Sequence, residues 1–263
     1  MSTDHRTKKA LHSFLLSMAD DELALGHRNS EWTGHSPILE EDIAFSNIAQ
    51  DELGHSLVWY TELEKHTGKS PDAMAFERPW EEFTCCHFVT YPKGDFAYTV
   101  VRQFLFDVGE EVRLTSLLQS SYAPFVDIAG KLLREEEYHI LHLRGLIERL
   151  GDATDESHKR MQAAVTMAFP QALGVFEKLS TEDDLIQEGV FPGNEKLQSQ
   201  WLESITPVLQ SASLSLPIQQ KNGTITPHCK PDNGGRSRDH TPHLQQLIDD
   251  LQVVYRAVPG ASW

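Results

Sequence analysis

The chain has 263 residues, of which 40% are hydrophobic and 24% are charged, so it can bury a substantial core and is not disordered as a whole. Its formal net charge of −16 excludes nucleic acid and an anionic membrane surface as partners, because both would repel it. No segment contains the run of about 20 apolar residues that a membrane span needs.

Two helices are predicted in the first quarter of the chain. Residues 7–29 carry apolar side chains at the spacing of an amphipathic helix. Residues 38–66 predict a second helix, because Pro37 and a run of acidic residues suit its start and Gly68 suits its end. Since only a short turn joins them, these helices are expected to form an antiparallel hairpin.

A second hairpin follows a long connection. Residues 67–95 gather proline, glycine and aromatic residues, and this segment is too long for a hairpin turn. Helical periodicity resumes over about 95–121 and again over 124–151, with a brief turn between them. Two helix hairpins joined by one long crossover have the connectivity of a ferritin-like four-helix bundle. We therefore predict an all-α protein with this bundle as its core.

Additional C-terminal helices are predicted beyond the bundle. Residues 154–179 predict a fifth helix, which Pro170 would kink, and residues 194–210 predict a sixth. Residues 211–240 lose apolar periodicity and gather Pro, Gly, Asn and Ser, so we expect an extended or mobile arm there. The Thr241–Pro242 pair then suits the start of a last helix.

All of these elements are expected to belong to a single ferritin-like domain covering residues 1–263. The core bundle would cover about 7–151. The accessory helices and the arm would cover 152–263.

The three cysteines do not form a disulfide framework. Cys85 and Cys86 are neighbours, Cys229 is distant, and no CxxC pair occurs. This pattern favours a reducing compartment, and the N-terminal stretch has only a short apolar run before acidic residues. We therefore expect a cytoplasmic protein. Cys85 and Cys86 are interpreted as packing residues, with a thiol function as the minor alternative.

The two hairpins repeat one pattern of metal-binding residue types. Glu52 and His55 share a helix face at spacing i, i+3, and Glu136 and His139 repeat this spacing in the second hairpin. The preceding helix of each hairpin offers one more carboxylate at a comparable height. One Glu from each of two helices and Glu-x-x-His from the other two are the ligands of a di-iron or di-manganese carboxylate site. The predicted metal ligands are Glu22, Glu52, His55, Glu110, Glu136 and His139.

Charge and ligand type support this prediction. Four carboxylates balance the four positive charges of two divalent ions, and neutral imidazoles add nitrogen ligands without adding charge. Asp107, one turn before Glu110, is predicted to accept the N–H of a ligand histidine and so to fix its tautomer. Neighbouring acids offer rival ligands: Glu135 and Glu137 beside Glu136, and Glu111 beside Glu110. Only Glu136 stands three residues before His139, whereas Glu110 is preferred because it shares a face with Phe106, Asp107 and Leu114.

Other histidines are interpreted as capping, surface or core residues and not as ligands. These are His27, His35, His142 and His158.

Several long stretches of the chain resemble one known family. They are "SEWTGHSPILEEDIAFSNIAQDELGH", "YPKGDFAYTVVRQFLFD", "YHILHLRGLIERLGDATDESHKRMQAA" and "HTPHLQQLIDDLQVVYRAVPG". Over nearly its whole length the sequence is similar to the C-type subunits of the phenylacetyl-CoA ring epoxidases, which serve aerobic phenylacetate degradation. The similarity extends to stretches that hold no predicted metal ligand, such as the last helix.

This resemblance implies a subunit of a multicomponent oxygenase. It implies pairing with an A-type subunit that carries a di-iron site and binds the CoA thioester. It also implies electrons from NADPH, delivered by a separate flavin and iron-sulfur reductase, and formation of a ring 1,2-epoxide. C-type subunits of this family are usually structural and have often lost their ligands. Here all six ligand positions keep metal-binding residue types.

Three functions follow from these observations. The first is a di-iron monooxygenase (epoxidase) component that itself binds two iron ions, with manganese as the other metal, and that works with the A-type subunit, the reductase and an acyl-CoA substrate. The second is a non-catalytic subunit that stabilises the A-type subunit. The third, which the resemblance disfavours, is a di-metal storage protein or peroxidase. Either of the first two implies an oligomer, formed with copies of itself or with other chains.

Overall fold

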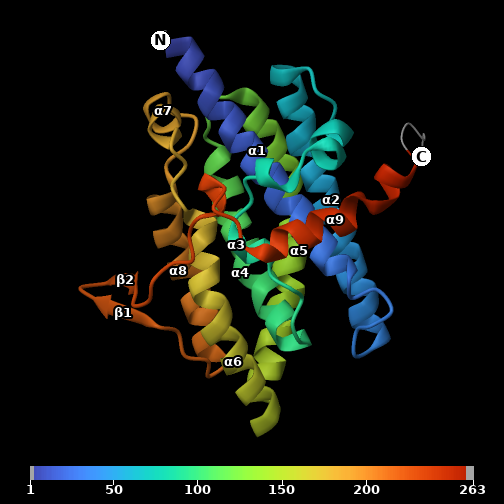
Figure 1. Cartoon of the computed structure of the whole chain (residues 1–263). Helices are drawn as coiled ribbons and strands as arrows, with labels where there is room; N and C mark the ends of the chain where they lie inside the picture. The colour runs from blue at the N-terminus through green and yellow to red at the C-terminus, as the bar shows by residue number, and fades with distance from the viewer. Residues whose placement is uncertain (1–2, 259–263) are drawn as a thin grey trace. The chain divides into compact units, whose positions relative to one another are not determined.

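The structure is a computed structural model that describes residues 3–258. The chain folds into two compact units. Unit 1 contains residues up to Pro92 and the C-terminal residues from Gly234 onward, and unit 2 contains Lys93–Asn233. Figure 1 shows that helices make up most of the chain. None of the helices among the described residues combines the length and apolar character that a membrane crossing requires.

Unit 1 is built on the first predicted hairpin. α1 (Thr3–Ser30) packs along α2 (Leu39–Thr67), as the blue ribbons of Figure 1 show. Gly68 ends α2 in the left-handed conformation, and its N–H donates to the Glu64 carbonyl at 2.7 Å. The hydroxyl of Ser56 donates to the Ala19 carbonyl at 2.9 Å and ties the two helices together. The predicted hairpin and its glycine stop are confirmed.

The connection after α2 is ordered into short helical pieces. A π-helical turn (Ala73–Glu77), a 3₁₀ turn (Trp80–Glu82) and α3 (His87–Thr90) follow one another. Between the first two, the guanidinium of Arg78 lies 2.5 Å from the Asp20 carboxylate and 2.8 Å from the Tyr60 hydroxyl. The crossover is therefore held to α1 by a buried ion pair.

The C-terminal segment returns to unit 1 and is anchored there. It forms a 3₁₀ turn (Gly235–Ser237) and α9 (Pro242–Ala257). The guanidinium of Arg236 lies 2.5 Å from the Asp21 carboxylate and also donates to the Thr84 carbonyl at 3.1 Å. A Cβ on Gly235 would lie 2.2 Å from the Cys85 carbonyl oxygen, so only glycine allows this close approach.

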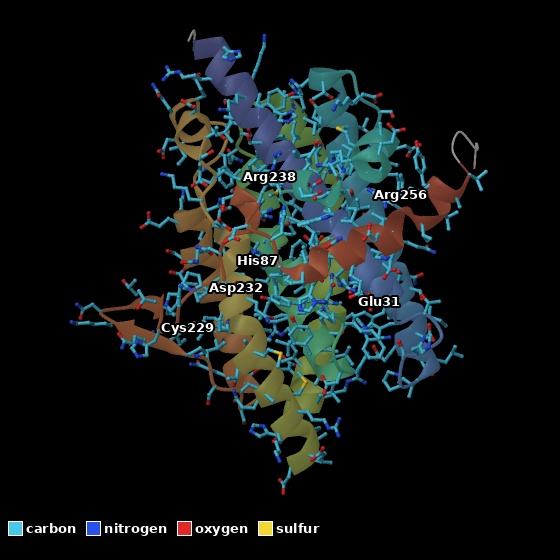
Figure 2. All side chains as sticks on the ribbon, in the orientation of Figure 1. Glu31, His87, Cys229, Asp232, Arg238 and Arg256 are labelled. Carbon is cyan, nitrogen blue, oxygen red and sulfur yellow. The ribbon has the colours of Figure 1, made fainter. Side chains whose placement is uncertain are left out.

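Two more contacts join the returning segment to α3. Nε2 of His87, a residue labelled in Figure 2, lies 2.6 Å from the Asp239 carbonyl oxygen. Thr241 precedes α9 as predicted, but its side chain makes no capping hydrogen bond. Its hydroxyl instead lies 3.3 Å from the Thr90 hydroxyl, because the tertiary contact competes with the local cap.

Unit 2 begins with the second predicted hairpin. α4 (Phe96–Leu117) packs against α5 (Ala123–Asp152). Asp95 caps α4, since its carboxylate accepts the Tyr98 N–H at 2.9 Å. The hairpin is confirmed.

The helices after this hairpin also belong to unit 2. α6 (Asp155–Ala172) and α8 (Asn194–Ser211) both contact α4. Trp201 of α8 is fully buried, and its indole N–H donates to the Leu105 carbonyl of α4 at 2.9 Å. The fifth predicted helix, expected to reach residue 179, is shorter in the structure. α6 ends at Ala172, two residues after Pro170, and a 3₁₀ turn (Leu173–Phe176) follows it. A short helix that was not predicted, α7 (Glu182–Gln187), lies before α8.

The arm predicted over 211–240 contains local structure that was not predicted. The arm contains an antiparallel hairpin of β1 (Ile218–Lys221) and β2 (Thr224–Pro227), in which Lys221 pairs with Thr224. Asn222 and Gly223 have φ values of 53° and 82°, as a two-residue hairpin turn requires. The Asn-Gly pair is itself a sequence signal for this turn. The all-α class is confirmed, whereas the single domain with a core over 7–151 stays a prediction.

Replacing Arg236 by methionine is expected to destabilise the protein strongly. The variant leaves the buried Asp21 carboxylate without its guanidinium, and breaking a buried pair in this way costs about 3–5 kcal/mol. The free energy of unfolding, measured by urea denaturation, tests this expectation.

Two controls accompany this variant. Arg160→Met removes an exposed pair with Glu156 and should change the stability little. The double variant Asp21→Asn, Arg236→Met should lose less than the single variant, because no unpaired charge remains. A single variant as stable as Arg160→Met would contradict the anchoring role of Arg236.

Candidate metal centre

Three of the predicted ligands meet within unit 1. Glu22 comes from α1, and Glu52 and His55 come from one face of α2. Their exposed fractions are 1%, 0% and 1%. Each offers a ligand atom, and these atoms all lie within 4.8 Å of one another. The hairpin thus brings together two carboxylates and an imidazole that come from two different helices.

The distance inside the first Glu-x-x-His pair is compatible with two ligand atoms of one ion. Nδ1 of His55 lies 3.7 Å from Oε2 of Glu52, which is too long for a hydrogen bond. Two atoms that each lie about 2.1 Å from one ion are separated by at most about 4.2 Å. The observed distance falls in this range. Carboxylate oxygens with imidazole nitrogen are also the donors that iron and manganese accept.

The second Glu-x-x-His pair lies in unit 2 and has a similar carboxylate-to-imidazole distance. Glu136 and His139 stand on one face of α5 and are fully buried. Nδ1 of His139 lies 3.9 Å from Oε2 of Glu136. The two pairs therefore present the same imidazole nitrogen to a carboxylate at nearly equal distances.

Asp107 of α4 also faces His139. Its Oδ2 lies 4.0 Å from Nδ1 of His139, longer than the hydrogen bond that the sequence suggested between an aspartate and a ligand histidine. The other oxygen, Oδ1, accepts a hydrogen bond from the side-chain amide of Gln103 at 2.6 Å. This hydrogen bond fixes the orientation of the Asp107 carboxylate.

Glu110 has a partner that sequence reasoning missed. Its Oε1 accepts from the guanidinium of Arg113, one turn further along α4, and both side chains are buried. A second nitrogen of Arg113 lies 3.5 Å from the Val175 carbonyl oxygen. The i, i+3 spacing of Glu110 and Arg113 was visible in the sequence, but such pairs are common on exposed helix faces.

Burial separates the predicted ligands from their rivals. Glu110 and Glu136 are buried, whereas Glu135 and Glu137 are exposed and Glu111 is half-buried. Burial, followed by the nearby Glu137 charge, raises the pKa of Glu111. The ligand roles of all six residues and the role of Asp107 stay predictions.

The remaining histidines and cysteines lie in other surroundings. The ring Nδ1 of His35 lies 3.2 Å from the Thr33 carbonyl oxygen, and that of His158 lies 2.8 Å from the Gly151 carbonyl oxygen. Burial lowers the pKa of His27. Cys85 is fully buried, and this burial, with the charges of Asp20 and Asp21, raises the pKa of its thiol well above the usual value.

The comparisons with known proteins agree with the fold. The family described as phenylacetic acid catabolic protein matches residues 1–263, so the chain belongs to this family of ferritin-like helical proteins. A relative from Escherichia coli (strain K12), the C subunit of 1,2-phenylacetyl-CoA epoxidase, is 30% identical over 254 residues. The match covers 96% of this chain and 99% of the relative.

Thiol labelling of the folded protein is expected to modify Cys229 before the other two cysteines. Cys229, which is labelled in Figure 2, is partly exposed, whereas Cys85 and Cys86 are buried. Iodoacetamide at pH 8 followed by peptide mass spectrometry measures each site, and denatured protein should label at all three. Equal labelling rates for Cys85 and Cys229 in the folded state would contradict the packing interpretation.

Proposed function

We propose that this chain is the C-type subunit of a phenylacetyl-CoA epoxidase and that it carries its own di-metal centre. One observation supports the centre above all: two buried Glu-x-x-His pairs with nearly equal carboxylate-to-imidazole distances, 3.7 and 3.9 Å. The relative named as the C subunit of this epoxidase aligns with nearly the full length of the chain. Family membership over the whole chain supports a role in phenylacetate breakdown.

The residues proposed to hold the metal follow the two hairpins. Glu22, Glu52 and His55 would hold one ion, and residues of α4 and α5, among them Glu136 and His139, would hold a second. Iron is the proposed metal, with manganese as the alternative, and a redox-active pair of this kind supplies oxygen chemistry when bound. The protein contributes buried carboxylates whose charge favours cations, and side chains that exclude water from the site.

The proposed complex includes other chains. We propose an A-type oxygenase subunit and a flavin and iron-sulfur reductase that draws electrons from NADPH as partners, with an acyl-CoA as the substrate. On α2, Leu39, Ile43 and Leu57 are 71%, 54% and 53% exposed. Exposed apolar surface of this kind is commonly covered by a protein partner, which supports contact of this helix with the A-type subunit.

A structural role is the second candidate function. The buried Arg113 beside Glu110 favours it, because this guanidinium supplies positive charge where a metal ion would otherwise supply it. In that case the chain would stabilise the A-type subunit and would leave the reaction to it.

Purified protein is expected to contain about two metal ions per chain, as two complete ligand sets require. Glu52→Ala and His139→Ala should each lose metal, because each removes a ligand from a different hairpin. Elemental analysis measures the content, and circular dichroism checks that the variants remain folded. A folded parent protein that takes up no metal after anaerobic loading with Fe²⁺ would overturn the proposed di-metal centre.

The Glu136→Ala variant separates a catalytic from a structural role. If the metal centre of this chain takes part in turnover, the variant should assemble with the A-type subunit and the reductase but lose most epoxidase activity. Size-exclusion chromatography measures assembly, and NADPH-dependent consumption of phenylacetyl-CoA measures turnover. Full turnover in the assembled variant would favour the structural role.

A further inference from the structure

We infer that Asp107, and not Glu110, is the α4 carboxylate that joins Glu136 and His139 in binding a divalent metal ion, while Arg113 remains paired with Glu110. This inference rests on the proposed metal binding and changes its ligand set. It assigns roles to two residues, Asp107 and Arg113, that differ from those expected for a ferritin-like site.

The distances from the imidazole favour Asp107. Nδ1 of His139 lies 4.0 Å from Oδ2 of Asp107 and 3.9 Å from Oε2 of Glu136. The two carboxylates therefore lie at almost the same distance from this nitrogen. Both distances fit within the separation of about 4.2 Å that two ligands of one ion reach. All three side chains are fully buried and belong to unit 2.

The orientation of Asp107 is fixed by its neighbour. The amide of Gln103, one turn earlier on α4, donates to Oδ1 at 2.6 Å, and Oδ2 is the oxygen near His139. Hydrogen bonds of this kind orient metal-binding carboxylates in many sites. Gln103 is thus a positioning residue for Asp107, whereas the sequence alone suggested that Asp107 positions a histidine.

Glu110 is engaged in a different interaction. Its Oε1 accepts from the buried guanidinium of Arg113. A guanidinium stays charged at any physiological pH, so it cannot make room for a metal ion by losing a proton. A divalent ion on Glu110 would have to lie beside this fixed positive charge, which disfavours binding there.

The formal charges of this cluster balance with one ion. Asp107, Glu110 and Glu136 are buried carboxylates with three negative charges between them. Arg113 supplies one positive charge and a divalent ion supplies two. The charges of these four residues and one divalent ion then sum to zero, which favours their burial together.

Two isosteric variants test the assignment in the full-length protein. Asp107→Asn should lower the affinity of one Co²⁺ site by at least about 100-fold, since even loss of a residue that only orients a ligand costs about 10- to 100-fold. Glu110→Gln combined with Arg113→Met should keep two bound Co²⁺ ions, because it removes a neutral pair that does not bind metal. Elemental analysis and the visible absorption of bound Co²⁺ measure occupancy without reliance on activity.

Gln103→Leu supplies a third measurement if Asp107→Asn does not fold. It leaves every proposed ligand in place and should weaken the same Co²⁺ site by about 10- to 100-fold. His55→Ala is the matched control, because it should weaken the other ion's site and leave the site of His139 filled.

The results separate the inference from the proposed function. Loss of one ion in the Glu110→Gln, Arg113→Met variant, with full occupancy in Asp107→Asn, would overturn the inference and leave the di-metal proposal standing. A folded parent protein that binds no Co²⁺ would overturn both. Loss of one ion in Asp107→Asn alone would support the assignment.

Discussion

Negative charge buried in an apolar interior governs how this chain packs. An isolated carboxylate is too costly to place there, so each buried acid needs a cation, hydrogen-bond donors or a proton. Three consecutive acids of α1, Asp20, Asp21 and Glu22, are almost completely buried. Successive residues of a helix point about 100° apart, so these three side chains leave α1 in different directions and need different partners.

Each of these acids has a different set of partners. Asp20 is bound by Arg78 of the crossover, and Asp21 by Arg236 of the returning C-terminal segment. Glu22 faces Glu52 and His55 of α2. The two ion pairs hold the crossover and the returning C-terminal segment against α1 in unit 1. The third set gathers two acids with an imidazole, an arrangement that a divalent cation stabilises.

In unit 2, the buried acids of α4 find their partners within the same helix. Arg113 binds Glu110, and Gln103 donates to Asp107. The arginine and the amide lie on the same helix as the acids that they satisfy, at spacings of three and four residues. Arg113 thus neutralises Glu110, whereas Oδ2 of Asp107 and Oε2 of Glu136 both face Nδ1 of His139.

Local patterns were enough to predict the two hairpins, the all-α class and both Glu-x-x-His pairs, because helical periodicity and the i, i+3 spacing can be read from neighbouring residues. Asn222-Gly223 was equally local, and the hairpin that it forms was predictable in principle. The arginine partners of Asp20, Asp21 and Glu110, in contrast, emerged only from the folded chain. Arg236 and Asp21 are 215 residues apart, and the pairing of Glu110 with Arg113 depends on burial that no local pattern reveals. Partner choice is a property of packing, since it depends on which charges the folded chain removes from water.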